Sequence, residues 1–401
     1  MKARAVSRLV SGMYREDAVR TVAKELRDQL KAPPTLGLLY FSPDYARHAA
    51  EFLEVVRLYA QVPVLAGCSG MGLMGTSEET ERRPGFSLML LHLPGCEVTP
   101  FAFDEALLNS VEGPEDWVQA TGLAPDEADA WLALINPFEI PADEWLESWN
   151  EAYPDTPTFG GLASGRVGES EAHLILNGER IEAGGLALAL RGVDVEMVVS
   201  QGCRPIGEPL TVTSAEENIM HTLGHQPAFE VLNTAYESLT EQEKEHAQGS
   251  LFAGLALSEY VDEYKRGDFL VRNIIGADPN AGSVALAALV RPGQTVQYHL
   301  RDANAAKVDL RLMLEAARKR LGDRQPLAAC VFTCTGRGRG LFGTNHHDAG
   351  LLDQFFRHLP AAGFFANGEI GPVAGVNYVH GYTASIALLL PKEEVPSGEG
   401  Q

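Results

Sequence analysis

The sequence predicts an α/β protein with mixed α+β sheets, in which repeated β-α-β-β units form two closely packed halves. Three segments share one pattern, and they cover residues 35–93, 128–192 and 330–390. Each begins with a short apolar run bounded by polar residues, as a buried strand does, and continues into a helical pattern. Each then passes through a turn of small residues and returns as an apolar strand. Because one supersecondary unit repeats, we expect the copies to stack on one another.

Prolines mark the helices of these segments. Pro43 and Pro141 suit the first turn of a helix, where a missing N–H costs nothing, and Asp348 is predicted to be an N-cap. Each helix is predicted to end at a proline, which breaks the helix and opens the next strand. Aligned on those prolines, the turns that follow read PVLAGCSGMG, PTFGGLASGR and PAAGFFANGE. The three prolines are Pro63, Pro157 and Pro360. The alternative interpretation is a chance similarity among glycine-rich α/β segments.

The stretch between the second and third copies, residues 196–322, differs from the repeat. Its apolar runs are separated by Asp-Pro-Asn and Arg-Pro-Gly turns, which predicts antiparallel strands, and a helix is predicted over residues 303–321. The second copy closes near residues 193–201, where we place the boundary between the two halves. The last residues, 391–401, are predicted to form a polar tail.

The charge balance excludes several classes of partner. Acidic residues outnumber basic residues by 54 to 32, which gives a formal net charge of −22. Such a surface repels phosphate backbones and anionic lipids, so neither nucleic acid nor membrane is an expected partner. The five cysteines form an odd and small set, which argues against a disulfide framework and for a reducing compartment. Since neither a secretory signal nor a membrane-length apolar run is recognisable, we expect a cytoplasmic protein.

An Arg-Gly loop follows the first strand of the third copy. Residues 338–343 match the dinucleotide pattern G-x-G-x-x-G, but the ribose-binding acidic residue is missing and the helix opens too late, so no nicotinamide cofactor is expected. The loop is better interpreted as an anion site that combines the guanidinium groups of Arg337 and Arg339 with glycine N–H groups. Alternatively, the arginines are solvated on an exposed turn, or one of them pairs with Glu369.

Two histidine arrangements suggest metal ligands, and another interpretation is favoured for both. Residues 345–348 read Asn-His-His-Asp, but adjacent histidines point to different faces, and Asp348 is explained as a helix cap. His347 is instead a candidate ligand contact or proton donor near neutral pH. His221 and His225 have helical i, i+4 spacing, but a Gly and a Pro place a turn there. We therefore expect no metal and no other cofactor.

Cys334 is the candidate nucleophile if the protein is an enzyme. It lies at a strand end beside an arginine, a setting that favours the thiolate, and His347 or His380 would be its base. Cys68 and Ser69 are less suitable, because GCSGMG lacks the second glycine of the G-x-S-x-G elbow. A buried structural cysteine is the alternative.

Several of these motifs make the chain resemble the FIST-domain proteins over about residues 30–390. The motifs are Cys334-Thr335-Gly336-Arg337, His347-Asp348, the run from Gly363 to Pro372, Val379-His380-Gly381, Gly67-Cys68-Ser69-Gly70 and the run from Gly202 to Gly207. The resemblance implies an N-type FIST domain at residues 31–195 and a C-type FIST domain at residues 196–390. A lead-in of residues 1–30 precedes them.

Such proteins are regarded as signal-transduction sensors that bind small ligands, with amino acids proposed, so binding is favoured here over catalysis. The resemblance covers FIST domains alone and includes no signalling output domain such as a kinase or a cyclase, so we expect the signal to pass to a separate protein. We expect an amino acid or another small carboxylate-bearing metabolite at the Arg-Gly and Gly-Glu turns, and we expect an Arg337→Ala variant to lose it without unfolding. The expected contacts are Arg337, Gly336, Gly338, Asn345, His347, Asp348, Asn367, Gly368, Glu369 and His380. The alternatives are an enzyme that uses Cys334 with a histidine base and a protein-interaction scaffold.

Overall fold

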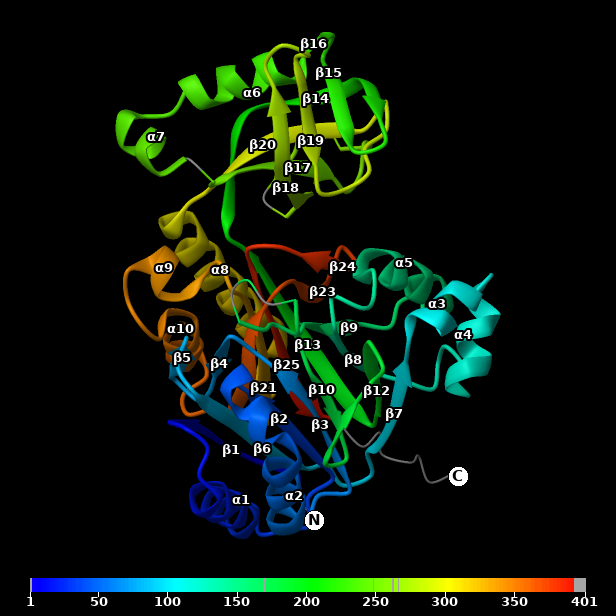
Figure 1. Ribbon diagram of the computed structural model, residues 1–401, viewed down its shortest axis with the longest axis vertical. Helices are drawn as coiled ribbons and strands as arrows, with labels where there is room; N and C mark the ends of the chain where they lie inside the picture. The colour runs from blue at the N-terminus through cyan, green and yellow to red at the C-terminus, as the bar shows by residue number, and fades with distance from the viewer. Residues whose placement is uncertain are drawn as a thin grey trace, which may run out of the picture. The chain divides into compact units, whose positions relative to one another are not determined.

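The computed structural model (Figure 1) describes residues 2–166, 168, 170–247, 249–261, 263–265 and 267–392. Both helices and strands occur throughout this part of the chain, and the sheets combine parallel with antiparallel pairs. The predicted α/β class with mixed sheets is therefore confirmed.

The described residues form two compact units. Unit 1 holds residues 2–200, 310–379 and 383–392, and unit 2 holds residues 201–309 and 380–382. All three repeated segments therefore contribute to unit 1. Most of the stretch that departs from the repeat forms unit 2.

Each repeated segment has the same strand order within unit 1. A first strand is joined through a helix to a parallel second strand, and a last strand pairs antiparallel with the first. The first segment contains β2 (Leu36–Phe41), the 3-10 helix η1 (Pro43–His48), α2 (Ala49–Ala60), β3 (Val64–Ser69) and β6 (Gly85–His92). The second contains β8 (Ala130–Ile135), α5 (Ala142–Ala152), β9 (Thr158–Leu162) and β12 (Gly185–Arg191). The third contains β21 (Ala328–Cys334), α9 (Gly338–Phe342), α10 (His347–Phe355), β22 (Ala361–Ala366) and β25 (Thr383–Pro391).

A further strand precedes each segment and pairs with that segment's last strand. These strands are β1 (Arg4–Ser11), β7 (Glu97–Phe103) and β13 (Val193–Gln201). Helices follow them, namely α1 (Glu16–Leu30), the pair α3 (Glu105–Ser110) and α4 (Pro114–Thr121), and α8 (Ala303–Leu321). The part of the chain that forms most of unit 2 is thus inserted between β13 and α8, which precede the third segment.

A hairpin between the second and last strands links each segment to a different one. The hairpins are β4 (Gly72–Met74) with β5 (Glu79–Glu81), β10 (Leu174–Leu176) with β11 (Glu179–Ile181), and β23 (Glu369–Val373) with β24 (Val376–His380). The hairpin of the first segment pairs with β22 of the third, that of the third with β9 of the second, and that of the second with β3 of the first. The exchange is cyclic, so each sheet of unit 1 is completed by another segment.

One glycine in each second strand permits close approach of its parallel neighbour. Gly67, Gly160 and Gly363 face Leu39, Ala133 and Val331, and a Cβ on any of these glycines would lie 1.7–1.8 Å from the neighbour's carbonyl oxygen. These glycines therefore define equivalent positions in the three segments. Gly67 lies four residues after its proline, whereas Gly160 and Gly363 lie three residues after theirs. An alignment on the glycines therefore shifts the first copy by one residue relative to the alignment on the prolines.

Two expectations about the helices are wrong. Helix α10 begins at His347 after a left-handed His346, so Asp348 is the second helical residue rather than the N-cap. Helices α2, α5 and α10 end before the prolines that follow them. In α2 the left-handed Gln61 ends the helix, because this conformation already reverses the chain.

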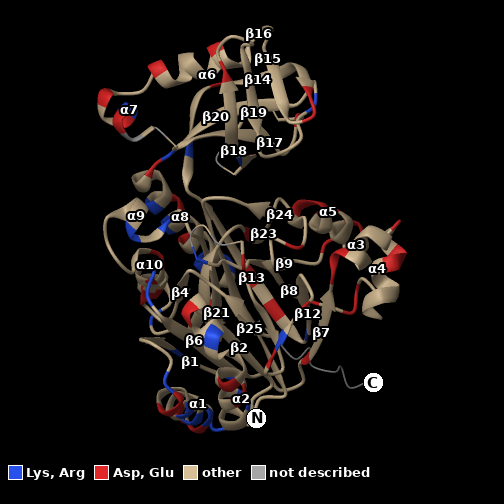
Figure 2. Cartoon of the chain, in the orientation of Figure 1, with Lys and Arg blue, Asp and Glu red and all other residues tan. Residues whose placement is uncertain are grey.

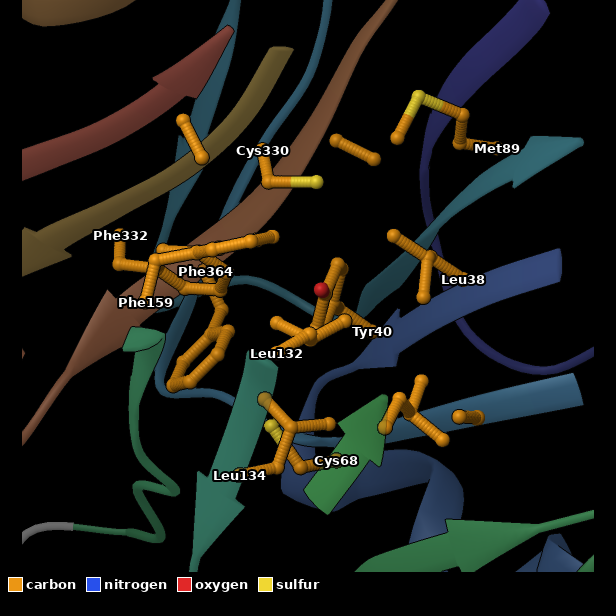
Figure 3. Close-up of a cluster of buried hydrophobic side chains, with 14 of the residues drawn as sticks. Leu38, Tyr40, Cys68, Met89, Leu132, Leu134, Phe159, Cys330, Phe332 and Phe364 are labelled. Atoms are coloured by element: carbon orange, nitrogen blue, oxygen red, sulfur yellow. The ribbon is translucent and has the colours of Figure 1, made fainter. Parts of the chain in front are cut away.

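Apolar side chains from all three segments meet in one core (Figure 3). Tyr40 lies 5.2 Å from Phe364 between ring centroids, and Phe332 lies 5.6 Å from Phe364 and 6.4 Å from Phe159. Aromatic pairs at these spacings add to the stability that area burial provides. The three segments of unit 1 thus share one hydrophobic core.

Unit 2 is built on a mainly antiparallel sheet, which agrees with the prediction for this stretch. Its strands are β14 (Cys203–Glu216), β15 (Ile219–Leu223), β16 (Gln226–Pro227), β17 (Leu251–Ala256), β18 (Phe269–Asp278), β19 (Ser283–Leu286) and β20 (Thr295–Arg301). Helices α6 (Ala228–Glu237) and α7 (Glu241–Ala247) complete it. His221 lies in β15 and His225 in the turn that follows, so they do not share a helical face.

Acidic residues recur in several helices, α5 and α7 among them (Figure 2). Helix α5 buries Trp145 and Trp149 and carries Asp143 and Glu144 in its first turn. Negative charge at a helix N-terminus interacts favourably with the helix dipole. The two acidic residues in the first turn of α5 therefore stabilise this helix.

We expect an alanine at any of the three close-approach glycines to destabilise unit 1 strongly. The added methyl group meets rigid backbone rather than a movable side chain, so we expect a loss of about 3 kcal/mol or more. Urea unfolding followed by tryptophan fluorescence measures this loss, because all four tryptophans of the chain lie in unit 1. The variants are Gly67→Ala, Gly160→Ala and Gly363→Ala.

Gly350→Ala is the matched control. Gly350 lies inside α10 with no atom within 4 Å of an added Cβ, so alanine should stabilise the helix by about 0.5–1 kcal/mol. Wild-type stability of the other three variants would contradict the strand register.

Candidate functional site

The polar residues of the third segment lie where β21 and β22 end and α9 and α10 begin. Thr333 and Cys334 close β21, Arg337 precedes α9, and Asp348 lies in the first turn of α10. Glu369 opens β23 after the turn that follows β22. Because β21 and β22 are parallel, these groups come together at one edge of the sheet.

A buried ion pair lies at the centre of this site. Arg337 donates from Nε to Oδ2 of Asp348 at 2.8 Å and from Nη2 to Oδ1 at 2.9 Å, and the two side chains are 0% and 2% exposed. The hydroxyl of Thr333 donates to Oδ2 at 2.7 Å, and Nδ1 of His347 lies 2.9 Å from Oδ1. Burial alone would raise the pKa of Asp348, but Arg337 and the hydrogen bonds outweigh it and hold the pKa well below its usual range.

Aromatic stacking fixes the short helix α9 over the ion pair. The ring of His347 stacks on Phe342 with centroids 3.5 Å apart and planes 9° apart. The guanidinium carbon of Arg337 lies 5.2 Å from the centroid of the same phenylalanine. A guanidinium over an aromatic ring is attracted by its π electrons, so α9 is held by the residues that it covers.

Glu369 is the second buried carboxyl group of the site. It is 0% exposed, its Oε2 accepts the backbone N–H of Thr383 at 3.1 Å, and Oε1 has no hydrogen-bond partner in the described part of the chain. Burial raises its pKa well above the usual value, although Thr383, Arg337 and the thiol of Cys334 all act to lower it. Environment therefore favours the neutral form of Glu369 and the ionised form of Asp348.

Sequence reasoning missed two carboxylates that reach the site from the first segment. Glu79 Oε1 accepts the backbone N–H of Ala349 at 2.8 Å, and the backbone N–H of Glu79 donates to Nδ1 of His346 at 2.7 Å. Glu81 Oε1 accepts the backbone N–H of Arg339 at 2.8 Å. Strand β5 thus caps the N-termini of α9 and α10. Their acidic character was the available signal, but nothing in the sequence places them beside residues so distant in the chain.

The other two segments carry neutral residues at the equivalent positions. The registers place Ser42 and Asn136 where the third segment has Cys334. Leu73 and Leu174 stand where it has Glu369. The buried carboxyl group is therefore a specific feature of the third segment and not a requirement of the fold.

The structure brings most of the predicted site residues together. Gly336 donates its N–H to the sulfur of Cys334 at 3.4 Å, and Gly338 begins α9 with φ +65° against the Glu81 carboxylate. The predicted anion site at the Arg-Gly loop is filled by carboxylates of the protein itself. Asp348 pairs with Arg337, and Glu81 accepts the backbone N–H of Arg339 in α9. Arg339 is exposed, as the alternative interpretation had it.

Four predicted residues lie outside this cluster of contacts or belong elsewhere. Asn345 is exposed before α10. The turn of Asn367 and Gly368 pairs with the end of β9, where Leu162 donates its N–H to Gly368 at 2.8 Å. His380 belongs to unit 2. Of the catalytic candidates, Cys334 is buried and His347 already contacts Asp348 through Nδ1.

The FIST N domain matches residues 35–226, and the FIST C domain matches residues 228–372. The chain belongs to the FIST family. FIST domains are in general sensor domains of signal transduction. No group of three or more potential ligands among the described residues is arranged to hold a metal ion, and no helix among them is long and apolar enough to cross a membrane.

The chain is also similar to proteins whose functions are not characterised. An uncharacterised protein of Mycobacterium tuberculosis (strain H37Rv) is 34% identical over 376 residues, which cover 93% of this FIST protein and 96% of the relative. One of Mycobacterium bovis is 35% identical over 375 residues, with 93% and 95% covered. The similarity thus extends through both FIST domains.

We expect the stability of unit 1 to fall as pH rises through about 7 because of Glu79. Burial and the nearby charge of Asp348 raise the pKa of Glu79 to about 7. Because this folded-state pKa lies above the unfolded value, the group stabilises the fold at low pH and loses that effect as it ionises. Between pH 5.5 and pH 8 the loss is about 2 kcal/mol.

Urea unfolding of wild type and Glu79→Gln at both pH values, followed by tryptophan fluorescence, measures the effect. His346 and Asp348 at the start of α10, and Glu81 in β5 itself, face Glu79 and are unchanged in the variant. The variant should lose about 2 kcal/mol less than wild type over this interval. An equal pH dependence in the two proteins would show that Glu79 is not the titrating group.

The buried ion pair changes the expectation for Arg337→Ala. Removal of one partner leaves the other charge buried, so we expect a loss of about 3–5 kcal/mol of stability. Arg339→Ala, at an exposed side chain, is the control and should change stability by no more than about 0.5 kcal/mol. Urea unfolding measures both, and near wild-type stability of Arg337→Ala would rule out the buried pair.

Proposed function

We propose that this FIST protein is a small-ligand sensor whose ligand binds at the third-segment site. The observation that carries the proposal is Glu369, a fully buried carboxyl with an oxygen that lacks a hydrogen-bond partner among the described residues. Such an atom costs free energy unless a partner is supplied, and the equivalent leucines avoid that cost. Perturbed pKa values concentrated in one place are typical of functional sites.

The ligand class follows from the groups at the site. An amino or hydroxyl group donates to Glu369 Oε1. Asn367 and Gly368 pair with the end of β9 and directly precede Glu369 in the chain, and they are kept as further proposed contacts. The carboxylate of the ligand binds at Arg337 with the amides of Gly336 and Gly338. An amino acid, or another small metabolite with a carboxylate, has both groups.

Binding at the anion position requires exchange with the protein's own carboxylates. Asp348 forms an ion pair with Arg337, and Glu81 accepts a hydrogen bond from a backbone amide of α9. A ligand carboxylate that displaces Glu81 releases it from the N-terminus of α9, whereas one that displaces Asp348 releases Asp348 from Arg337, with His347 and Asn345 close by in sequence. Such an exchange gives the sensor two states with different contacts, and a separate signalling protein reads the difference.

Glu369→Leu should abolish the ligand response and leave the fold intact. Leucine occupies the equivalent position in both other segments, so the fold accommodates it there. Because the buried N–H of Thr383 loses its acceptor, we expect a stability loss of about 1–3 kcal/mol without unfolding. A thermal-shift screen of amino acids and small organic acids measures the response, and a ligand at 100 times its Kd stabilises wild type by about 2.7 kcal/mol.

Glu179→Gln is the control for this screen. Glu179 is exposed on the equivalent hairpin of the second segment, so this variant should respond like wild type. A full response in Glu369→Leu would place the site elsewhere. If no compound shifts wild type, the proposed ligand class is wrong.

A further inference from the structure

The chain leaves unit 1 for only three residues at the end of the hairpin that carries Glu369. Strand β24 ends at His380 and β25 begins at Thr383. Residues 380–382 belong to unit 2, whereas the residues on both sides belong to unit 1. The short connection between the two strands is therefore also a covalent link between the units.

Tyr382 is anchored in unit 2 through its ring and its hydroxyl group. Its ring centroid lies 4.3 Å from that of Phe252 in β17, and its hydroxyl lies 3.1 Å from Oδ1 of Asn273 in β18. The guanidinium carbon of Arg301 in β20 lies 5.4 Å from the ring centroid. Tyr382 has φ +60°, a conformation that is rare for a large side chain and persists only when its surroundings hold it.

Thr383, the next residue, is anchored to Glu369 in unit 1. Its N–H donates to Glu369 Oε2 at 3.1 Å, and the two residues are 1% and 0% exposed. The peptide bond between Tyr382 and Thr383 is planar, so the N–H of Thr383 and the carbonyl of Tyr382 turn as one group. Any movement of that N–H therefore rotates the backbone of a residue whose ring is fixed in β17 and β18.

We propose that Tyr382 and Thr383 form a relay through which a change at the Glu369 carboxylate alters the packing of β17 and β18. The relay depends on these contacts and not on the identity of any ligand. It extends the proposed function, because it gives a signal at Glu369 a defined route to unit 2.

Backbone hydrogen exchange tests the relay without a ligand. Glu369→Leu removes the acceptor of the Thr383 N–H, and we expect exchange in β17 and β18 to become roughly tenfold faster. Glu369→Gln keeps an oxygen acceptor, so exchange in these strands should stay at the wild-type rate. In a Tyr382→Ala background, Glu369→Leu should no longer change exchange in β17 and β18.

Ser385→Ala is the matched control for the hairpin itself. Ser385 donates from Oγ to the carbonyl of Ile370 at 2.9 Å, so this variant removes a neighbouring buried hydrogen bond to the same hairpin and leaves Glu369, Tyr382 and Thr383 unchanged. An effect on β17 and β18 as large as that of Glu369→Leu would overturn the proposal. So would unchanged exchange there while the Thr383 amide itself exchanges faster.

A reverse measurement covers the case in which Glu369→Leu does not fold, as judged by tryptophan fluorescence. Tyr382→Ala leaves Glu369 in place and removes the anchor in unit 2, so the Thr383 amide should exchange faster. A wild-type rate at Thr383 would overturn the relay.

Discussion

The cyclic exchange of hairpins is the constraint on which unit 1 depends. Strands β4, β10 and β23 each complete the sheet of another segment, so the strand edges of one copy are paired by the next. Unpaired strand edges are sites of aggregation, and the exchange pairs them within one chain. It also brings β5 of the first segment to the helices of the third, where its carboxylates meet the first amides of α9 and α10.

The exchange explains why the candidate site draws on residues so far apart in the chain. The third segment supplies Arg337, Asp348 and Glu369, and the first supplies Glu79 and Glu81. Helix α9 is too short to be stable alone, because helix formation needs several turns to offset its nucleation cost. A carboxylate from another segment and the stacking of Phe342 on His347 hold it in place. The site therefore forms only when all of unit 1 has folded.

Much of the fold could be predicted from local sequence, and much of the site could not. Apolar runs and turns indicated the repeated strands, the antiparallel stretch and the helix over residues 303–321. The partners of Arg337 were less accessible, because Asp348 was explained locally as an N-cap whereas its oxygens face the guanidinium. Glu79 was missed because hairpin exchange leaves no periodic signal. The one-residue shift of the first copy could not be predicted either. The prolines lie in loops of variable length, whereas the glycines are fixed by the close approach of the parallel strands.

The pKa values of the carboxyl groups in the site depend on burial and on which of these groups is paired with a cation. Arg337 is paired with Asp348 and keeps that carboxylate ionised, whereas burial favours the neutral forms of Glu79 and Glu369. Burial is the main cause for both glutamates and the charge of Asp348 adds to it, so the environment separates their titrations from that of Asp348. A second cation would change the balance in favour of ionised Glu369. The amino group of the proposed ligand would be such a cation, and it would meet the one oxygen of Glu369 that has no partner among the described residues.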